Sequence, residues 1–294
     1  MNNKKIDDFL KQERLPEQYR HTVFPWFKDL ADDVFLLYKK ADKPLVIGLQ
    51  GSQGSGKSTL AKLLALLLKP LSVVSLSLDD FYLTHQQRQE LAQHVHPLLA
   101  TRGVPGTHDV VLALRTLAQL QQTAPTDDCL IPRFDKSIDD RLPESEWSLV
   151  RGKVDLIILE GWCLGAEAQT AAEVALPIND LEKNEDSSSV WRTYVNDCLA
   201  DEYQKLFKKI DYLALLNPPT FERVYQWRLL QEQKLSEQSD KKNRLMNETE
   251  LRRFIQHFER LTQHCLKTLP QRADWCFELD SEHTVVACHR KVGG

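Results

Sequence analysis

The chain has 294 residues, with 38 basic and 42 acidic side chains and a formal net charge of −4. This balance, without a long basic run, gives no reason to expect a nucleic acid partner, and no segment is apolar enough to span a membrane. The six cysteines are scattered without a C-x-x-C pair and the N-terminal residues are polar, so we expect structural thiols in a soluble, cytoplasmic protein.

Residues 1–40 are predicted to form helices that pack in front of a core, although they carry no recognisable motif. Their apolar side chains are the candidate contacts: Phe9, Leu10, Phe24, Trp26, Phe27, Leu30, Phe35 and Leu36. We interpret this segment as an N-terminal extension of a kinase-sized core that spans residues 44–280. The whole chain is predicted to be one domain.

Short apolar runs alternate with helical stretches along the rest of the chain. The predicted strands are 44–50, 71–78, 128–132, 154–160, 210–216 and 274–280. One predicted helix ends before Pro70, and another begins at the N-cap residue Asp109. Strands this apolar, separated by helices, indicate a parallel sheet covered on both faces. The polar stretches 181–190 and 236–248 are predicted to be loops or mobile insertions.

The sequence GSQGSGKS at 51–58 matches the phosphate-binding pattern G-x-x-x-x-G-K-[ST], with a predicted strand before it and a helix after it. A glycine-rich turn of purely structural use is the alternative, but the lysine, the serine and both flanks favour phosphate binding. Lys57 is expected to reach the outer phosphates, and Ser58 to ligate Mg²⁺. The predicted nucleotide-binding residues are Gly51, Ser52, Gln53, Gly54, Ser55, Gly56, Lys57, Ser58 and Thr59.

Carboxylates follow other predicted strands, where the ligands of an open parallel sheet bind. Asp79 is a candidate for the base that accepts a hydroxyl proton, and Glu160 is a candidate Mg²⁺ ligand. Turn or helix-cap roles are the alternative for both.

Basic residues near the same edge offer a seat for an anion. Arg133, Lys136 and Arg141 suit a carboxylate or phosphate, although a solvated charged loop is the alternative. Arg223 and Arg228 lie on a predicted helix that could close over the nucleotide as a lid, or they could be ordinary surface arginines.

Seven motifs resemble, in order, the plant-type D-glycerate 3-kinase family. They are GSQGSGKST, SLDDFYLT, HPLLATRGVPGTHD, IPRFDKS, IILEGWCLG, VNDCLADEYQKLF and VYQWRLLQE. This family lies within the group of P-loop kinases that contains phosphoribulokinase, uridine kinase and pantothenate kinase. The resemblance covers roughly residues 44 to 280.

The resemblance implies a P-loop NTPase αβα sandwich with sheet order 2-3-1-4-5, a helical lid, and the use of ATP with Mg²⁺. It gives catalytic roles to Asp79, Lys57, Glu160 and Arg228. The residues it implies around the acceptor are Asp80, Tyr82, Arg102, His108, Asp109, Arg133, Asp135 and Lys136. One departure, SIDDRLPESEW, reaches Asp140 and Arg141 without the usual glycine, so the identity of the acceptor stays open.

We therefore predict an ATP- and Mg²⁺-dependent kinase that phosphorylates an alcohol of a small anionic metabolite, with glycerate as the first candidate. The alternatives are a regulatory nucleotide-binding protein, or a kinase relative with a pantothenate-like or nucleoside acceptor. No N-K-x-D, T-K-x-D or L-S-G-G-Q motif is present to favour a guanine switch or an ABC-type ATPase. We expect a monomer or weak dimer without nucleic acid or membrane partners.

Overall fold

The computed structural model describes residues 3–122, 124, 126–238 and 248–291. The strands in this part of the chain are β1 Leu45–Gly51, β2 Val73–Ser77, β3 Asp128–Ile131, β4 Phe134–Asp135, β5 Asp140–Arg141, β6 Ser148–Arg151, β7 Leu156–Gly161, β8 Tyr212–Asn217, β9 Trp275–Leu279 and β10 Val285–Arg290. The α-helices are α1 Asn3–Gln12, α2 Arg20–Thr22, α3 Lys28–Lys40, α4 Lys57–Leu67, α5 His85–His94, α6 Val110–Gln122, α7 Ala171–Ala175, α8 Asp180–Glu185, α9 Val190–Ala200, α10 Glu202–Phe207, α11 Phe221–Gln238 and α12 Glu248–Thr268. Short 3-10 helices are η1 Glu17–Tyr19, η3 Leu78–Phe81, η4 Pro97–Ala100 and η5 Glu144–Glu146, and η2 Val23–Phe27 is a π-helix.

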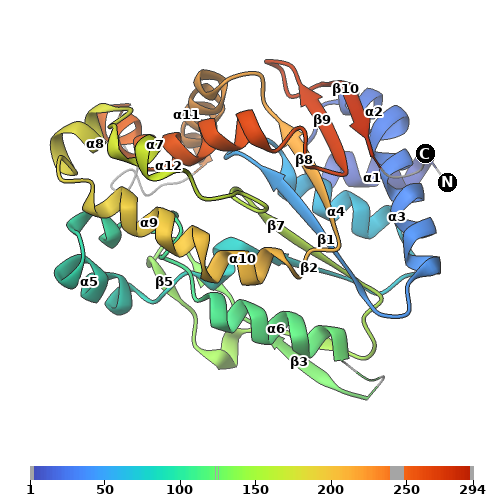
Figure 1. Ribbon diagram of the computed structural model, residues 1–294. Coiled ribbons are helices and arrows are strands. Elements are labelled where there is room, and N and C mark those ends of the chain that lie inside the picture. The colour runs from blue at the N-terminus through green and yellow to red at the C-terminus, as the bar shows by residue number, and fades with distance from the viewer. Residues whose placement is uncertain (1–2, 123, 125, 239–247, 292–294) are drawn as a thin grey trace.

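The central sheet has the order β10-β9-β8-β1-β7-β2 (Figure 1). Its strands β2, β7, β1, β8 and β9 are parallel, and β10 runs antiparallel to β9. The order 2-3-1-4-5 implied by the family resemblance is confirmed, with 154–160 as the third strand. Both faces of β1 and β7 are buried, which explains why their sequences are continuous apolar runs and not alternating ones.

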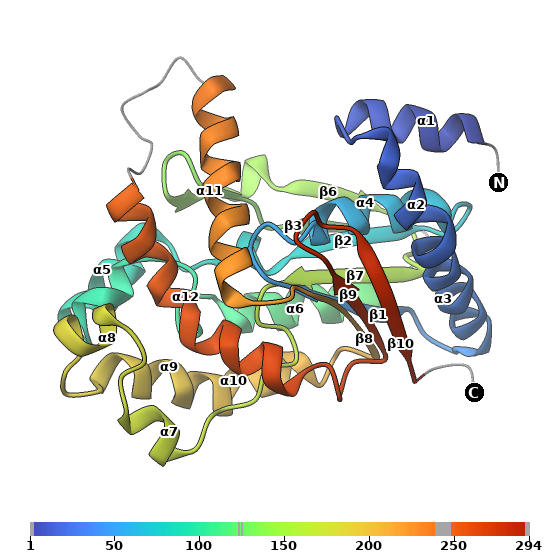
Figure 2. The same cartoon turned by 90° about the horizontal axis from the view of Figure 1, so that it is seen from above.

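Helices cover the sheet on its two faces, as Figure 2 shows from above. On one face α6, α10 and α12 pack on the sheet through a large apolar cluster that includes Leu117, Tyr203 and Phe258. On the other face α4 and α3 enclose a second cluster that includes Leu60 and Leu30. The predicted αβα sandwich is therefore confirmed.

The prediction that 128–132 belongs to the parallel sheet is wrong. β3 pairs antiparallel with β6 in a separate two-stranded ribbon. Burial alternates along β3, with Cys129 and Ile131 covered and Asp128 and Leu130 exposed. One face alone packs on the core, and a run this short does not reveal that difference from a fully buried strand.

The N-terminal residues form the expected helices, and α1 and α3 pack on the second cluster. Phe9, Leu10, Phe27 and Leu30 are buried there, and Trp26 and Phe35 are half-buried against it. The prediction fails at two side chains: Leu36 is exposed, and Phe24 lies at the margin of exposure. Both lie on the outer surface of the helices. The division of the chain into one domain stays a prediction.

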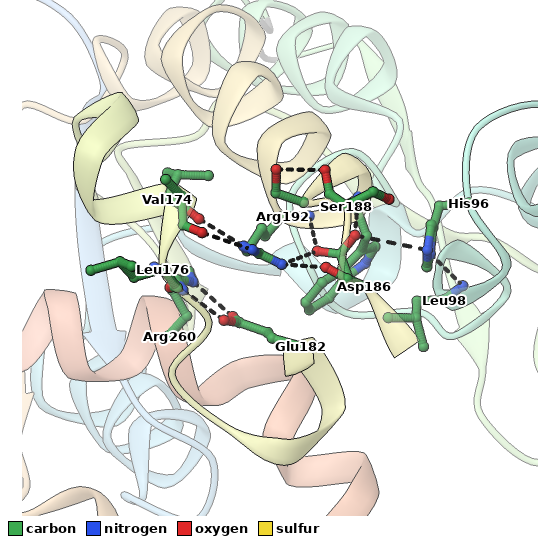
Figure 3. Close-up of polar contacts among 12 residues, drawn as sticks. His96, Leu98, Val174, Leu176, Glu182, Asp186, Ser188, Arg192 and Arg260 are labelled. Carbon is green, nitrogen blue, oxygen red and sulfur yellow. Dashed lines mark hydrogen bonds and ion pairs between the residues drawn. The ribbon is translucent and has the colours of Figure 1, made fainter. Parts of the chain in front are cut away.

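The predicted loop at 181–190 instead contains most of α8 and the first residue of α9, joined by a short turn at 186–189. The Asn179 side chain accepts a hydrogen bond from the Glu182 amide and caps α8. Two of its charged residues are buried rather than solvated, because Asp186 pairs with Arg192 and Glu182 pairs with Arg260 of α12 (Figure 3). A count of charged residues in one segment does not reveal that their partners come from elsewhere.

The other predicted loop, 236–248, lies mostly outside the described residues. Its first three residues end α11, and Glu248 begins α12.

Strand β10 was not predicted. Among the described residues, the helices are all too short or too polar to cross a bilayer.

Candidate active site

The phosphate-binding loop connects the end of β1 to the start of α4, as the motif requires. Gly54 and Gly56 have φ angles of 78° and 90°, which side-chain-bearing residues rarely adopt. A Cβ at Gly54 would also lie 2.9 Å from the Cβ of Trp227 on α11. Gly51 is the buried last residue of β1. The Lys57 Nζ lies 3.5 Å from the Ser52 carbonyl, within the loop itself. The conformation is that of a phosphate cradle at a helix N-terminus.

Ser58 and Glu160 meet beside the loop because β7 is the neighbour of β1 in the sheet. The Ser58 hydroxyl lies 2.8 and 2.7 Å from the two Glu160 carboxylate oxygens. Glu160 is buried, so its carboxylate has little water around it. Two hard oxygen donors at this distance fit Mg²⁺, whose remaining ligands would be phosphate and water oxygens. In the described part of the chain, no three acidic, histidine or cysteine side chains form a self-contained metal site.

Asp79 lies in η3, directly after β2, and is therefore at the same edge of the sheet as the loop. Its Oδ1 accepts a hydrogen bond of 2.8 Å from the Tyr82 hydroxyl, and its Oδ2 lies 2.5 Å from Lys136 Nζ. Burial would raise the pKa of the Asp79 carboxyl, but the charges of Lys136 and Lys57 outweigh burial and hold it well below its usual range. Asp79 is thus an ionised carboxylate near the phosphate loop.

A cavity of about 540 Å³ joins these groups. Its walls come from the phosphate loop, the ends of β2 and β7, the segments that carry Tyr82, Arg102 and Lys136, the helices α11 and α12, and the β9–β10 turn. They are Gln53, Gly54, Gly56, Lys57, Ser58, Thr59, Ser77, Asp79, Tyr82, Arg102, Lys136, Glu160, Trp227, Arg228, Leu230, Phe254, Phe258 and His283. All four predicted catalytic residues line one cavity.

Two cations reach this cavity from different segments. Lys136 follows β4, and its side chain is 58% exposed. Arg102 precedes the turn at Gly103 and forms a short ion pair with Asp139, which also pairs with the buried Arg88. Burial would raise the pKa of Asp139, but Arg102 and Arg88 together lower it. The cavity wall therefore includes two ion-paired cations in addition to Lys57 and Arg228.

Other predicted acceptor residues lie one layer behind the cavity wall. Arg133 donates to Asp80 at 2.7 Å, and Asp80 also accepts from the Phe134 amide, so this pair ties the β4–β5 hairpin to η3. Burial raises the pKa of Asp80, although Arg133 opposes the shift. Asp135 accepts from the Ser137 amide at 2.7 Å. These three residues hold the β4–β5 hairpin in place and do not line the cavity.

His108 and Asp109 are also behind the wall. His108 is buried, stacks on the Tyr82 ring at 4.5 Å, and has its Nδ1 2.5 Å from the Tyr203 hydroxyl. Burial lowers the pKa of His108 to about 4, so the ring is neutral near pH 7. Asp109 caps α6 through the Leu112 amide and pairs with Arg141. These contacts support Tyr82, whose carbonyl oxygen accepts two further hydrogen bonds from Arg141.

Helix α11 contributes to the cavity wall and carries two arginines, which differ in whether they reach the cavity. Arg228 lines the cavity with its guanidinium 5.9 Å from the Phe254 ring, whereas Arg223 is exposed and donates to Gln226. Trp227 stacks on His283 of the β9–β10 turn at 4.0 Å and donates its indole N–H to Ser281. This stack and hydrogen bond hold α11 against the β9–β10 turn. Of the two arginines, Arg228 is therefore the one that lines the cavity, and its role as a lid arginine stays a prediction.

A second cavity of about 600 Å³ lies on the other side of the loop. It shares Gly54, Gly56, Thr59 and His283 with the first cavity. The remaining wall is less charged and comes from the N-terminal segment and the β9–β10 turn: Arg14, Leu15, Pro16, Gln18, Tyr19, Thr22, Phe27, Ser55, Leu216, Leu279, Glu282 and Thr284.

Comparison with known proteins gives this geometry a family. No family model matches the chain. The uncharacterized kinase mug58 of Schizosaccharomyces pombe is 38% identical over 230 residues, which cover 75% of this chain and 80% of that protein. The chloroplastic D-glycerate 3-kinase of Arabidopsis thaliana is 34% identical over 222 residues. The chain belongs to the D-glycerate 3-kinase family of P-loop kinases. The match covers 72% of this chain but 46% of the plant protein.

A solved structure agrees with this family. The D-glycerate 3-kinase of Cryptococcus neoformans superimposes with a TM-score of 0.72 at 25% identity, over 90% of this chain and 99% of that one. The protein is accordingly a P-loop kinase of small molecules, and the sandwich fold, the loop and the carboxylate-ended strands described above are those of such a kinase.

Several cavity residues of this D-glycerate 3-kinase family member were not predicted. Trp227, Phe254, Phe258 and His283 line the cavity from α11, α12 and the β9–β10 turn. Trp227 stands next to the predicted Arg228, so the lid motif contained a signal for it. The other three belong to no motif that we recognised, and their place depends on how α12 and β10 fold back across the sheet.

Proposed function

We propose that the protein transfers the γ-phosphoryl group of ATP to a hydroxyl group of D-glycerate, with Mg²⁺ at Ser58 and Glu160. The observation that carries this proposal is that a carboxylate, Asp79, and two cations, Lys136 and Arg102, share one cavity with the phosphate loop. An acceptor that carries both a hydroxyl and a negative charge fits such a set. The names of the Arabidopsis and Cryptococcus relatives support glycerate as that acceptor.

The two cavities suggest a division between the substrates. The nucleoside of ATP would occupy the second, less charged cavity, where Tyr19 and Phe27 offer apolar surface and Thr22 and Glu282 offer hydrogen-bonding groups. Its phosphates would cross the loop at Gly54 and Gly56, which border both cavities. The γ-phosphoryl group would then face Asp79 and Arg228.

The roles of the remaining residues follow from charge and reach. Lys57 and the backbone amides of the loop hold the phosphate oxygens, and Arg228 neutralises charge that develops on the transferred group. Ser58 and Glu160 would hold Mg²⁺, which when bound would supply positive charge that offsets the charge of the phosphates. Asp79 accepts the proton of the attacking hydroxyl group. Phe258 and Phe254 keep part of the wall apolar and restrict water.

A direct assay tests this proposal. Purified protein is supplied with Mg-ATP and one acceptor at a time: D-glycerate, pantothenate or uridine. We expect ADP release with D-glycerate, and a phosphorylated hydroxy acid in the ³¹P NMR spectrum. If ADP is released only with another acceptor, D-glycerate is not the substrate. If ADP is released with none of the three acceptors, a regulatory nucleotide-binding protein is favoured.

A further inference from the structure

The candidate base Asp79 is paired with a cation, Lys136, through one of its two carboxylate oxygens. The carboxylate of Asp79 accepts the Tyr82 hydroxyl on Oδ1 and the Lys136 ammonium on Oδ2. Both contacts are short, at 2.8 and 2.5 Å. An acceptor hydroxyl that approaches from the cavity therefore meets a carboxylate on which each oxygen already accepts one donor, and the Lys136 charge on Oδ2 weakens that oxygen as a base.

The two donors differ in how firmly they are held. Tyr82 is buried, with 5% of the residue exposed, and its ring contacts the rings of His108 and Phe134. Its backbone carbonyl oxygen accepts a hydrogen bond from Arg141. The Lys136 side chain is 58% exposed and extends from a hairpin of two-residue strands. A lysine ammonium sits on a flexible four-carbon stem and can change partners at little cost. Oδ2 is thus the oxygen that can be freed.

The charges around Asp79 make its carboxylate a weak base while this contact lasts. The groups that face it are Lys136 from the hairpin, Lys57 from the start of α4, Tyr82 directly after η3, His108 from the loop before α6 and Cys163 from the segment after β7. His108 is neutral near pH 7 and burial raises the pKa of the Cys163 thiol, so the two lysines supply the cationic charge in this group. They outweigh burial and lower the pKa of Asp79.

We propose that Lys136 makes phosphorylation depend on a negative charge of the acceptor, because its ammonium leaves Asp79 for that charge and so frees the base. This inference rests on the proposed function, since it concerns the acceptor half of the same cavity. Arg102 lines that cavity too and gives the acceptor anion a second cation. A neutral polyol offers no charge to draw Lys136 away, and its hydroxyl meets an occupied carboxylate.

The transfer step then proceeds with the released carboxylate. Asp79 Oδ2 takes the proton of the acceptor hydroxyl as its oxygen forms a bond to the γ-phosphorus. The bond from that phosphorus to the bridging oxygen of the β-phosphate breaks, and its electron pair leaves with ADP. The proton on Asp79 passes to solvent when the product departs and Lys136 returns to the carboxylate.

A pair of acceptors tests this inference. D-glycerate and glycerol carry the same kind of hydroxyl group, but glycerol lacks the carboxylate. In the wild type we expect kcat for glycerol to be at least about 100-fold below kcat for D-glycerate, the size of effect that a general base supplies. Lys136→Met should raise kcat for glycerol by about 10-fold, while it lowers kcat/KM for D-glycerate by a similar factor. The gain on the neutral acceptor is the result that a mere binding role for Lys136 would not give.

The pH profile provides a second readout with a defined sign. Lys136 lowers the pKa of Asp79, so Lys136→Met should raise it, and kcat/KM should begin to fall at a higher pH on acidification than in the wild type. Arg102→Met is the matched control, because it removes another cation of the cavity that does not contact Asp79. It should weaken D-glycerate binding without any gain on glycerol.

The outcomes separate this inference from the proposed function. If Lys136→Met lowers turnover of both acceptors by the same factor, or if Arg102→Met gives the same gain on glycerol, Lys136 does not gate the base. If the wild type releases no ADP with D-glycerate, the proposed function itself is wrong. An unchanged midpoint temperature of thermal unfolding in each variant shows that the compared proteins are folded.

Discussion

Two groups of ion pairs in this protein differ in how fully each charge is enclosed. In the cluster between α8, α9 and α12, the side chains of Asp186 and Arg192 are 0% and 2% exposed. Arg192 also donates to the carbonyls of Val174, Ala175 and Asp186, and Asp186 accepts two backbone amides (Figure 3). In the cavity, the side chains of Asp79 and Lys136 are 30% and 58% exposed.

The comparison shows that the same chemistry can fix a structure or leave it adjustable. A buried ion pair with every donor satisfied is costly to break, because loss of one partner leaves a charge without water or counterion. An exposed pair contributes little to stability and can exchange partners. The first kind holds the insertion between β7 and β8 on α12, and the second kind is suited to a reaction in which charges must move.

Loss of the buried pair should have the largest effect. Arg192→Met is expected to lower the free energy of unfolding by about 3–5 kcal/mol, because Asp186 remains buried and uncompensated. Denaturant unfolding at pH 7 measures it. Arg253→Met is the control. Arg253 of α12 pairs with Glu185 of the same insertion, but both side chains are exposed, at 50% and 39%. Equal losses for the two variants would refute the distinction drawn here.

Removal of the base should affect the reaction and spare the fold. Asp79→Asn is expected to lower kcat by about 100- to 1,000-fold, or about 3–4 kcal/mol of barrier, because an amide accepts no proton. Binding of Mg-ATP, followed by calorimetry, should persist. Wild-type turnover in this variant would show that another group takes the proton.

Acid should lower the free energy of unfolding through His257 of α12, which packs against the insertion between β7 and β8. Burial lowers the pKa of His257 to about 4, and its ring stacks edge-on against Trp191. The unfolded chain, with a pKa near 6.5, therefore binds this proton first, and stability present above about pH 6.5 is lost as the pH falls toward about 4.

His257→Gln tests this titration. The variant should lose about 2 kcal/mol less than the wild type between pH 6.5 and pH 4, as measured by denaturant unfolding across that range. The two proteins should differ by a constant amount above pH 7. A parallel decline of both proteins below pH 6.5 would assign the acid sensitivity to other groups.

The smallest effect is expected at the surface. The Lys62 ammonium lies 2.7 Å from Glu13 of the N-terminal segment, and its side chain is 59% exposed. Lys62→Met should change the free energy of unfolding by less than about 1 kcal/mol and leave ADP release unchanged. A larger loss would mean that this contact holds α1 to α4 more firmly than its exposure indicates.

The sequence was informative wherever local pattern and function coincide. The phosphate loop, its flanking strand and helix, and Asp79 and Glu160 at strand ends were predicted correctly in position, because the carboxyl ends of parallel strands must share one edge of the sheet. The N-cap at Asp109 and helix 221–235 also depend on neighbouring residues alone. These features are short-range, so the linear sequence contains their cause.

Tertiary structure decided the features whose partners are distant in the chain. Glu182 in the segment 181–190 looks solvated until Arg260, 78 residues later, is brought against it. β3 looks like a core strand until β6 pairs with it, and His108 and Arg133 look like acceptor ligands until Tyr203 and Asp80 occupy them. The sequence by itself thus determined that a phosphate cradle and two carboxylates meet at one edge. Only packing decided which charges are enclosed and which remain able to move, because enclosure depends on what the rest of the chain places around each group.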